Sequence, residues 1–485
     1  MIATRLGLRV LLVERGRHPR FAIGESASPL AGVLIENLAD CYDLPRVRPF
    51  ASYGEWRRHY PDVVCGLKRG FTYYKHAEGQ AYAPAPDRSN QLLVAASPCD
   101  EISDTHWLRA DVDHFLVREA VARGVEYLDE TTLDCLEWQP NGDAIVAGTR
   151  AARPLRFRSR RIADASGPRG FLARALKLDA PGFGDYPATQ ALYSHFTGVA
   201  CCQDMAEYAD PEAPPYPVDA AALHHVFDEG WMWVLRFDNG VTSAGVAVTD
   251  AFAAELRLSD GEAAWHRLLA RYPTIAAQFA EAKPIREFTW MPRVAYRTTV
   301  ASGPGWALLP SAAAFVDPLF STGIPLSLLG IERIAKLLEG RHHLDADAYS
   351  VTTLAEADHT ARFIAGCYAA FPRFADFVSY SMFYFAAASF SEMTRRLQQK
   401  GHGFLCGQDD TFAADLARLS PQRNSVGDVH VEVARAVECF NVAGLCEPSK
   451  RNWYGVDLQD AVRGAHKLGV APREVEELIR TTITS

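Results

Sequence analysis

The first residues of the chain have the hydrophobic pattern of a parallel α/β sheet. Residues 8–14 are rich in Leu and Val and end in Glu14, which is typical of a fully buried strand, and residues 1–7 predict the tail of a helix. In a dinucleotide-binding βαβ unit, the acid at the end of the second strand accepts hydrogen bonds from a ribose, and Glu14 has that position. An ordinary surface Glu after a strand is the more common situation for this residue taken alone.

The pattern changes further along the chain. Residues 105–123 predict a helix, and residues 160–167 predict a short strand ending in Asp164-Ala-Ser-Gly, where small residues permit close approach of a ligand or a neighbouring helix. Short alternating runs between residues 186 and 296 predict an antiparallel sheet. After Gly340 the chain becomes helical and rich in Phe and Tyr, and we expect a packed core there rather than a substrate lid. The pattern as a whole indicates an α/β (α+β) protein with a β-rich second lobe and a C-terminal helical region.

Composition narrows the classes of partner. The chain has 485 residues, 48% of them hydrophobic, and a formal net charge of −9, which argues against nucleic acid or an anionic membrane as partners and favours a small organic substrate. The ten cysteines form no CxxC pairs and have no His partners at zinc-site spacing, so we expect reduced thiols and no bound metal. The N-terminus lacks the apolar core of a secretory signal, and the longest apolar stretch, residues 306–331, is interrupted by Asp317 and three prolines. These features predict a cytoplasmic protein without a membrane span.

Residues 306–338 contain the most informative segment. A strand leads through Asp317-Pro318-Leu319-Phe320 into Ser321-Thr322-Gly323, where an apolar helix begins. The first N–H groups of a helix have no intrahelical partners, and with the helix dipole they can bind a small anion such as chloride or bromide. An ordinary helix capped by Ser321 or Thr322 is the alternative, and it is the commoner case for such a segment alone.

Two tryptophans mark a second segment, LHHVFDEGWMWV at residues 223–234. Trp231 and Trp233 point to the same side of a strand, where they can wall off a cavity or simply pack in the core. His224 and His225 are candidate acid–base groups, although packed or surface histidines are more common.

Lys68 marks a third segment, CGLKRGFTYY at residues 65–74. It stands in an apolar, strand-like surrounding beside Gly66 and Gly70, which permit close backbone approach. Most lysines are solvated, so Lys68 alone does not indicate a site.

Together these segments resemble the flavin-dependent halogenases, in particular the phenol-modifying members. Phe315, Pro318, Ser321 and Gly323 match the halogenase signature FxxPxxSxG, which is more specific than general flavoprotein features. The likeness runs from the first residues to at least Gly340. It includes HPRFAIGESASP (18–29), CGLKRGF (65–71), LRADVDHF (108–115), MPRVAYR (291–297) and LLPSAAAFVDPLFSTG (308–323).

The resemblance implies an organisation and an activity. An FAD-binding, Rossmann-like lobe of the aromatic hydroxylase type would comprise residues 1–60, 100–175 and 295–340, a substrate lobe residues 61–99 and 176–294, and a helical region residues 341–485. Reduced FAD, O2 and chloride or bromide would yield hypohalous acid, which Lys68 would hold, or convert to a haloamine, beside an electron-rich phenol. Glu25 is a candidate acid for substrate deprotonation.

Further roles implied by the resemblance fall into three groups. Halide would be held by Ser321, Thr322 and Gly323. FAD would contact Glu14, Ala22, Gly24, Ser26, Arg109, Asp164 and Asp317. Trp231, Trp233, Pro318 and Phe320 would separate the substrate from the flavin and so suppress direct hydroxylation.

The sequence departs from the family pattern at three places. A GxGxxG turn should precede Glu14 by about 20 residues, and there is no room for it, so we expect a truncated start. Leu235-Arg236 replaces Ile-Pro of the family's WxWxIP. Phe320 stands where tryptophan halogenases carry a glutamate, which favours a phenol over free tryptophan.

Other readings remain open. A flavin monooxygenase or another oxidoreductase of the same fold would keep Glu14 and Arg109 without needing Lys68, and a non-catalytic remnant would hold no FAD. For a halogenase, the chain has no second dinucleotide fingerprint, so a separate NAD(P)H-dependent flavin reductase would supply reduced flavin. The small aromatic substrate would be free or tethered to a carrier protein.

Overall fold

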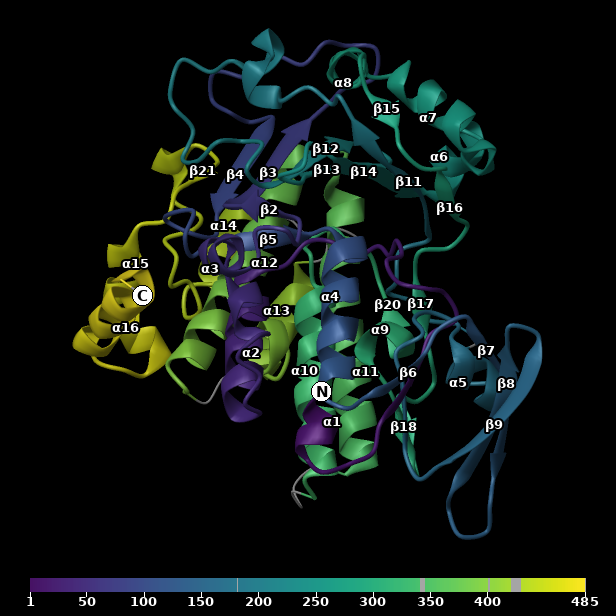
Figure 1. The fold of residues 1–485 in the computed structure, drawn as a ribbon. Helices are drawn as coiled ribbons and strands as arrows, with labels where there is room; N and C mark the ends of the chain where they lie inside the picture. Colours follow the sequence, from purple (N-terminus) through teal and green to yellow (C-terminus); the bar gives the residue numbers. More distant parts are fainter. Residues whose placement is uncertain (181, 341–344, 400–401, 420–428, 485) are drawn as a thin grey trace.

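A large mixed sheet forms the centre of the protein (Figure 1). The computed structural model describes residues 1–180, 182–340, 345–399, 402–419 and 429–484. Within these residues the sheet has nine strands in the order β15-β11-β14-β13-β12-β3-β4-β21, with β16 beside β11. Its strands are β3 (Gly70–Lys75), β4 (Gln91–Ala95), β11 (Thr189–Thr197), β12 (Ala222–Phe227), β13 (Gly230–Arg236), β14 (Thr242–Thr249), β15 (Lys283–Pro284), β16 (Thr289–Met291) and β21 (Trp453–Tyr454).

The antiparallel sheet predicted for residues 186–296 is confirmed, and strands from outside this range extend it. Neighbouring strands are antiparallel except for the pairs β12–β3 and β21–β4. The C-terminal region is therefore not purely helical, because β21 forms the edge of the sheet beyond β4. A two-residue strand gives too little periodicity to be recognised in a sequence.

The alternation of side chains along the strands builds two separate cores. Tyr73 and Trp231 face α11 (Ala346–Ala370) and α12 (Phe374–Arg396), whose Phe and Tyr side chains are largely buried. The prediction of a packed aromatic core after Gly340 is thereby confirmed. Tyr74 and Met232 face the other side, which α6 (Asp250–Glu255), α7 (Glu262–Leu269) and α8 (Pro273–Gln278) cover.

Smaller sheets lie beside the central one. The strand β1 (Leu11–Val13) pairs in parallel with β6 (Glu126–Leu128), and α1 (Ile2–Arg5) precedes it, as predicted. The prediction that this strand is fully buried was wrong, since Leu12 is 37% exposed. Among the described strands β1 pairs with β6 alone, so it has a sheet neighbour on one edge only.

The helix predicted within residues 105–123 and the strand predicted within residues 160–167 are also confirmed. Residues 105–123 contain α4 (Arg109–Ala122), and β10 (Ile162–Asp164) pairs in parallel with β19 (Trp306–Leu308). The predicted strand and helix of the signature segment are confirmed as β20 (Ala314–Phe315) and α10 (Gly323–Leu338), with residues 316–322 forming the turn between them. The other strands are β2 (Cys65–Lys68), β5 (Asp104–Trp107), β7 (Thr131–Trp138), β8 (Ala144–Arg150), β9 (Arg153–Ser159), β17 (Tyr296–Arg297) and β18 (Ser302–Gly303).

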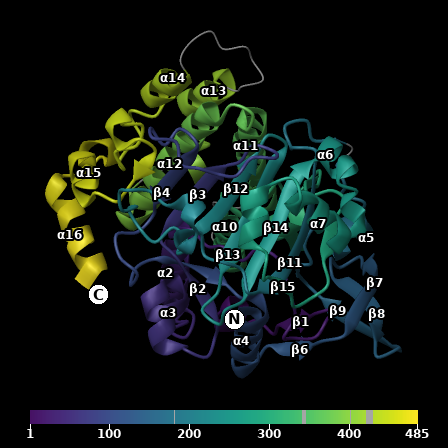
Figure 2. The same cartoon turned by 90° about the horizontal axis from the view of Figure 1, so that it is seen from above.

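The remaining helices surround these sheets. Seen from above, α13 to α16 lie around one end of the central sheet, whereas β7 to β9 lie at the opposite end (Figure 2). No helix in the described ranges is both long and apolar enough to cross a membrane. These helices are α2 (Pro29–Cys41), α3 (Tyr53–His59), α5 (Phe171–Leu176), α9 (Pro310–Ala313), α13 (Asp410–Arg418), α14 (Val429–Ala436), α15 (Leu458–Arg463) and α16 (Pro472–Thr484).

Gly66 in β2 and Gly70 at the start of β3 allow close backbone approach on both sides of Lys68, as the sequence predicts. A Cβ atom at Gly66 would lie 1.9 Å from the carbonyl oxygen of Arg236, and one at Gly70 would lie 2.2 Å from that of Val94. Both contacts are with backbone, which cannot rotate away. The close packing of β2 between β5 and the end of β13 therefore requires glycine.

We predict that Gly66→Ala destabilises the protein by about 1–3 kcal/mol, because the added methyl group overlaps the Arg236 carbonyl. Thermal unfolding followed by circular dichroism measures the effect. Gly184→Ala is the matched control, since a Cβ atom there has no neighbour within 4 Å and the residue is exposed. Equal unfolding temperatures for the two variants would contradict the packing described.

Candidate active site

Lys68 is fully buried at the end of β2. Its ammonium donates a hydrogen bond to the carbonyl oxygen of Ala27 (2.5 Å) and another to Ser321 Oγ (3.4 Å), and it lies 4.0 Å from the centre of the Phe71 ring. Burial lowers the pKa of Lys68, while the nearby Asp104 opposes that shift. An amine with a lowered pKa exchanges protons more readily near neutral pH than a solvated lysine does.

The signature turn stands directly beside Lys68. Ser321 has a φ of 58°, a left-handed conformation that is rare for a residue with a side chain, and its N–H donates to the Pro318 carbonyl (3.0 Å). Thr322 is the N-cap of α10, but its side chain makes no capping hydrogen bond. A Cβ atom at Gly323 would meet nothing within 4 Å. The turn thus leaves open space next to the first, unpartnered N–H groups of a long helix.

Trp231 of β13 is linked to this turn by hydrogen bonds, and Trp233 packs beside it. Trp231 is 1% exposed, and its Nε1 donates to Tyr368 OH (3.1 Å), which donates to Asp317 Oδ2 (2.9 Å). Trp233 lies on the same side of the strand, with its ring centre 5.7 Å from that of Trp231. Burial raises the pKa of Asp317 to about 7. The aromatic wall and the signature turn therefore form one hydrogen-bonded unit.

Phe320 and Pro318 complete the apolar side of the turn. Phe320 is fully buried and stacks on Tyr384 of α12, with ring centres 4.0 Å apart. The Tyr384 hydroxyl donates to the Phe320 carbonyl (3.2 Å), and Pro318 is half-buried. The position that a glutamate would occupy in a tryptophan halogenase is thus filled by a stacked aromatic ring.

The histidines before the tryptophans are packed groups. His224 stacks on Tyr73, with ring centres 4.4 Å apart, and burial lowers its pKa to about 3. His225 lies 2.8 Å from Gln278 Oε1 and 3.0 Å from His76, and burial lowers its pKa to about 4. Both are neutral at physiological pH and are held by protein partners, which is the commoner of the two situations expected for them.

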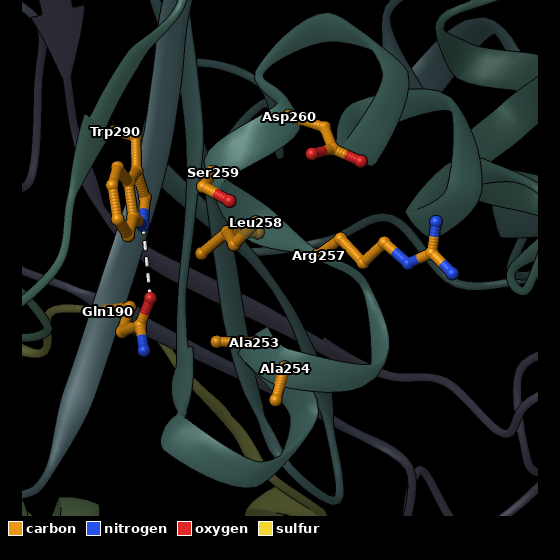
Figure 3. A pocket seen from close by; sticks show the side chains of 8 residues that line it. All are labelled: Gln190, Ala253, Ala254, Arg257, Leu258, Ser259, Asp260 and Trp290. Carbon is orange, nitrogen blue, oxygen red and sulfur yellow. Dashed lines mark hydrogen bonds between the residues drawn. The ribbon is translucent and has the colours of Figure 1, made fainter.

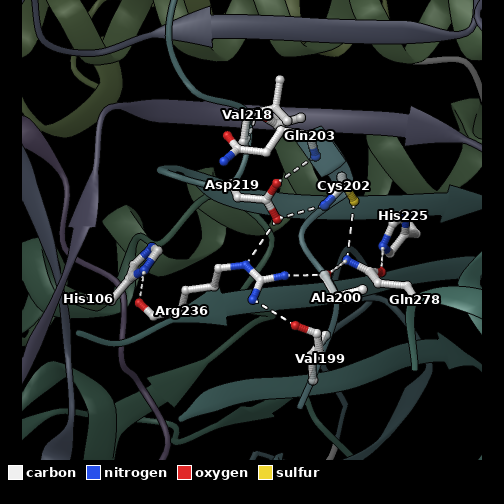
Figure 4. Close-up of polar contacts among 11 residues, drawn as sticks. His106, Val199, Ala200, Cys202, Gln203, Val218, Asp219, His225, Arg236 and Gln278 are labelled. Carbon is white, nitrogen blue, oxygen red and sulfur yellow. Dashed lines mark hydrogen bonds and ion pairs between the residues drawn. The ribbon is translucent and has the colours of Figure 1, made fainter. Parts of the chain in front are cut away.

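Arg236 has a structural role at the place where the WxWxIP pattern ends (Figure 4). Its Nε donates to Asp219 Oδ1 (3.0 Å), and its two Nη atoms donate to the carbonyls of Val199 and Ala200. Asp219 in turn accepts from the backbone N–H of Cys202 and of Gln203. This network fixes the end of β13 on the side of the sheet opposite the tryptophans.

A cavity of about 240 Å³ lies next to Phe71, and Lys68 does not itself line it. Phe71, which contacts the Lys68 ammonium, lines this cavity with Asp104, Tyr384 and Phe385. Its outer part is lined by residues of the C-terminal region, including Leu478 and Ile479 of α16. The lining is mostly apolar, which suits a flat organic ring.

A second, more open pocket of about 350 Å³ lies elsewhere, at the edge of the sheet (Figure 3). Residues of α6 and the 257–260 segment line it together with Gln190 and Trp290, whose Nε1 donates to Gln190 Oε1 (3.0 Å). Its described lining contains none of the candidate residues and no buried unpartnered titratable group, so the cavity lined by Phe71 and Asp104 is the better candidate site.

The residues predicted to bind cofactor come from four parts of the chain, namely residues 14–26, Arg109, Asp164 and Asp317. Arg109 Nη1 donates to the carbonyls of Ile23 (2.9 Å) and Gly24 (3.1 Å), while the rest of its guanidinium pairs with Asp113. Gly24 has a φ of 96°, which places the 22–26 loop against α4. Glu14 accepts a hydrogen bond from the Gly16 N–H (2.7 Å) and pairs with Arg20 (3.0 Å).

Asp164 serves local structure. Its carboxylate accepts from the backbone N–H groups of Ser166 and Leu172, both at 2.7 Å, and from the Ser166 hydroxyl. These contacts hold the turn after β10 and the start of α5. They satisfy both carboxylate oxygens with protein donors.

Glu25 is held by two residues that sequence reasoning missed. His195 Nε2 lies 2.7 Å from Glu25 Oε1, and Ser243 Oγ donates to Glu25 Oε2 (2.7 Å). The three come from the 22–26 loop, β11 and β14. Their meeting depends on tertiary structure, and no local signal in the sequence identifies it.

Unpartnered polar atoms beside this loop mark a place for a polar ligand. Ser26 Oγ and Arg286 Nε are buried and have no hydrogen-bond partner, and the Arg286 guanidinium lies 3.3 Å from the centre of the Phe21 ring. Buried polar groups without partners are uncommon in proteins unless a ligand or water binds them. A hydroxyl and a guanidinium are suitable donors for the carbonyl groups of a flavin ring. No group of three or more metal-ligating side chains occurs in the described residues.

Comparison with known proteins identifies the family. The model of the tryptophan halogenase family matches residues 94–381, more than half of the chain, so the chain belongs to this family of flavin-dependent halogenases. The resemblance drawn from the sequence is thereby confirmed. The match contains both the tryptophan pair and the FxxPxxSxG turn.

Two curated relatives are halogenases by name. Monodechloroaminopyrrolnitrin halogenase PrnC of Pseudomonas fluorescens is 28% identical over 384 residues, which is 77% of this chain and 66% of PrnC. Tetracycline 7-halogenase of Kitasatospora aureofaciens is 29% identical over 331 residues, which is 67% of this chain and 58% of that protein. The chain thus spans about three fifths to two thirds of the length of these relatives.

A solved structure confirms the α/β fold class. Halogenase PltM in complex with phloroglucinol and FAD has a TM-score of 0.80 with 22% sequence identity, and the match covers 93% of this chain and 95% of PltM. The likeness therefore extends through the helical C-terminal region, where the sequence resemblance is weaker.

We predict that Asp317→Asn changes the pH dependence of stability. The folded carboxyl holds its proton up to about pH 7, whereas an unfolded Asp releases it near pH 4. Unfolding of the wild type therefore becomes easier as the pH rises between these values, by at most roughly 1.4 kcal/mol per pH unit, and the variant lacks this contribution. As the pH rises between about 4 and 7, the unfolding free energy of Asp317→Asn should therefore increase relative to that of the wild type. A difference that stays constant with pH would rule out a buried, protonated Asp317.

Proposed function

We propose that this protein is an FAD-dependent halogenase of electron-rich, phenolic aromatics, with Lys68 as the residue that delivers the halogen. The observation that carries the proposal is the position of the Lys68 ammonium. It contacts Ser321 of the signature turn on one side and Phe71 of the cavity on the other. A buried lysine that bridges an anion-binding turn and an apolar cavity fits the transfer of a halogen between two compartments.

The halide fits the start of α10. Open space beside Gly323 and the free N–H groups at Thr322 and Gly323 offer donors and a favourable dipole to chloride or bromide. Ser321, whose hydroxyl accepts from Lys68, lies between this space and the ammonium.

FAD fits the 22–26 loop and its surroundings. Ser26 and Gly24, with Ala22 beside them and Arg286 opposite, would hold the ring. Glu14 would contact the ribose, Arg109 would act on the cofactor's backbone through the loop, and Asp164 and Asp317 would support the turns around it. When bound in reduced form with O2, the cofactor supplies the oxidising power that converts halide to hypohalous acid.

The protein residues control what happens to the hypohalous acid. The Lys68 ammonium would hold it by a hydrogen bond, and as an amine Lys68 could form a haloamine. Trp231, Trp233, Pro318 and Phe320 fill the space around the turn with packed rings, which separates an aromatic substrate from the cofactor. This separation favours halogenation over direct hydroxylation.

The cavity favours a phenol. It is mostly apolar, and Phe320 leaves no carboxylate at the position before Ser321 that could fix the ring of a free tryptophan. A phenol needs less activation, because its own oxygen donates electron density to the ring. A separate NAD(P)H-dependent reductase would supply the reduced flavin. The FAD-binding lobe, the substrate lobe and the helical region proposed from the sequence would meet at Lys68.

We expect Lys68→Met to lose at least about 100-fold of bromination activity while FAD binding is retained, because positioning of the electrophile is lost. The assay is mass spectrometry of resorcinol and phloroglucinol incubated with the full-length protein, bromide, FAD, a flavin reductase and NADH. The exposed Lys283→Met is the matched control.

The products separate the possible functions. A bromine isotope doublet that depends on Lys68 supports the proposal. Hydroxylated product would instead identify a monooxygenase, and the absence of any product from protein with bound FAD would contradict halogenation of these phenols.

A further inference from the structure

Asp104 is the residue paired with Lys68 across the short β2–β5 sheet. The two are register partners in this antiparallel pair, so their side chains leave the sheet on the same side. Asp104 is 5% exposed and Lys68 is fully buried. Within the described part of the chain no direct ion pair joins them, so the ammonium does not occupy the hydrogen-bonding positions of the Asp104 carboxylate.

One carboxylate oxygen of Asp104 lacks a partner. Its Oδ2 is buried and accepts no hydrogen bond, although an unpaired buried acceptor is costly. Asp104 also lines the cavity beside Phe71, Tyr384 and Phe385. An orphan acceptor at the wall of an apolar cavity indicates a ligand that brings its own hydrogen-bond donor.

The other acidic groups of the cavity wall are already engaged. Glu392 accepts from Arg396 (2.8 Å), which also pairs with Glu36 (3.7 Å). Asp457 accepts from the backbone N–H of Gln459 (2.9 Å). Among the described lining residues, Asp104 is the carboxylate with a buried oxygen that has no hydrogen-bond partner.

We propose that Asp104 is a catalytic residue that accepts the hydroxyl proton of the phenolic substrate while Lys68 holds the halogen source. The proposal rests on the proposed function and gives its substrate class a structural basis. It also moves this role away from Glu25, because His195 and Ser243 occupy both oxygens of Glu25.

The reaction balances on this pair of residues. As the ring carbon donates its electron pair to the halogen of hypohalous acid, the O–halogen bond breaks, and the released oxygen takes a proton from the Lys68 ammonium to form water. The phenol proton passes to Asp104. The ring then loses its C–H proton to the Lys68 amine through solvent, and Asp104 returns its proton to the phenol oxygen. The ring carbon is oxidised, the halogen is reduced, and both residues regain their starting states.

The electrostatics of the pair support this exchange. Burial raises the pKa of Asp104 and lowers that of Lys68, and each charge partly offsets the shift of the other. Glu392 and Arg396 of α12 are the further charged groups that act on Asp104, with opposite effects. Groups with such shifted affinities can give and take protons near neutral pH.

The test compares Asp104→Asn with the wild type in binding and in turnover. Binding of resorcinol and of 1,3-dimethoxybenzene is measured by quenching of protein fluorescence. We expect the wild type to prefer resorcinol at least about 10-fold and Asp104→Asn to lose that preference, because the ether has no proton to donate. Asp100→Asn, an exposed neighbour paired with Arg69, is the matched control.

Turnover tests the proton transfer itself. The rate at which Asp104→Asn brominates resorcinol should fall about 100-fold relative to the wild type. The rate with 4-nitrophenol should fall far less at a pH where this phenol is ionised in solution, because it then has no hydroxyl proton to transfer. Unchanged preference and rate in the variant would overturn the proposal. If Asp104→Asn does not fold, Asp104→Glu replaces it. It should keep the preference for resorcinol with a reduced rate, and loss of that preference would equally overturn the proposal.

The two assays distinguish failure of this proposal from failure of the proposed function. Lys68-dependent bromination with no effect of Asp104→Asn would overturn the role of Asp104 alone. Asp104-dependent binding of resorcinol without bromination would overturn the halogenase function and retain the phenol site.

Discussion

The burial of one ammonium group determines the arrangement of the whole site. Lys68 is removed from water between the Ala27 carbonyl, the Ser321 hydroxyl and the Phe71 ring, and such a charge needs compensation. Each compensating group comes from a different part of the chain. The loop before α2, the turn before α10 and the first strand of the central sheet must therefore meet at one point. Asp104 supplies the nearest opposite charge from β5.

The central sheet makes this meeting rigid. One face of β3 and β13 carries Phe71, Tyr73 and the two tryptophans, and α11 and α12 press against that face. Through Tyr368 and Tyr384, the same helices reach Asp317 and Phe320 of the signature turn. The proposed wall between cofactor and substrate is thus part of the main core, and a change in these residues should disturb the fold as well as the chemistry.

Local patterns predicted much of this arrangement. The alternating runs predicted the antiparallel strands. The segment after Phe320 predicted the start of α10, because the start of a helix depends mainly on residues that are close in sequence. Lys68 could be selected from its apolar surroundings and the resemblance to the halogenases. Asp104 could not, because its importance depends on the register of β5 against β2, and the same holds for His195 and Ser243 around Glu25. The burial of β1 was overestimated, since apolar composition does not reveal how many neighbours a strand has.

The central claim is that the aromatic substrate binds on the far side of Lys68 from the signature turn. A crystal of the full-length protein soaked with 4-iodophenol tests it directly, because anomalous scattering locates the iodine without assumptions about the ring. The account predicts an iodine peak in the cavity between Phe71 and Phe385, with the phenol oxygen at Asp104. A peak only in the pocket at Gln190 and Trp290, or on the side of Ser321 away from Lys68, would contradict it.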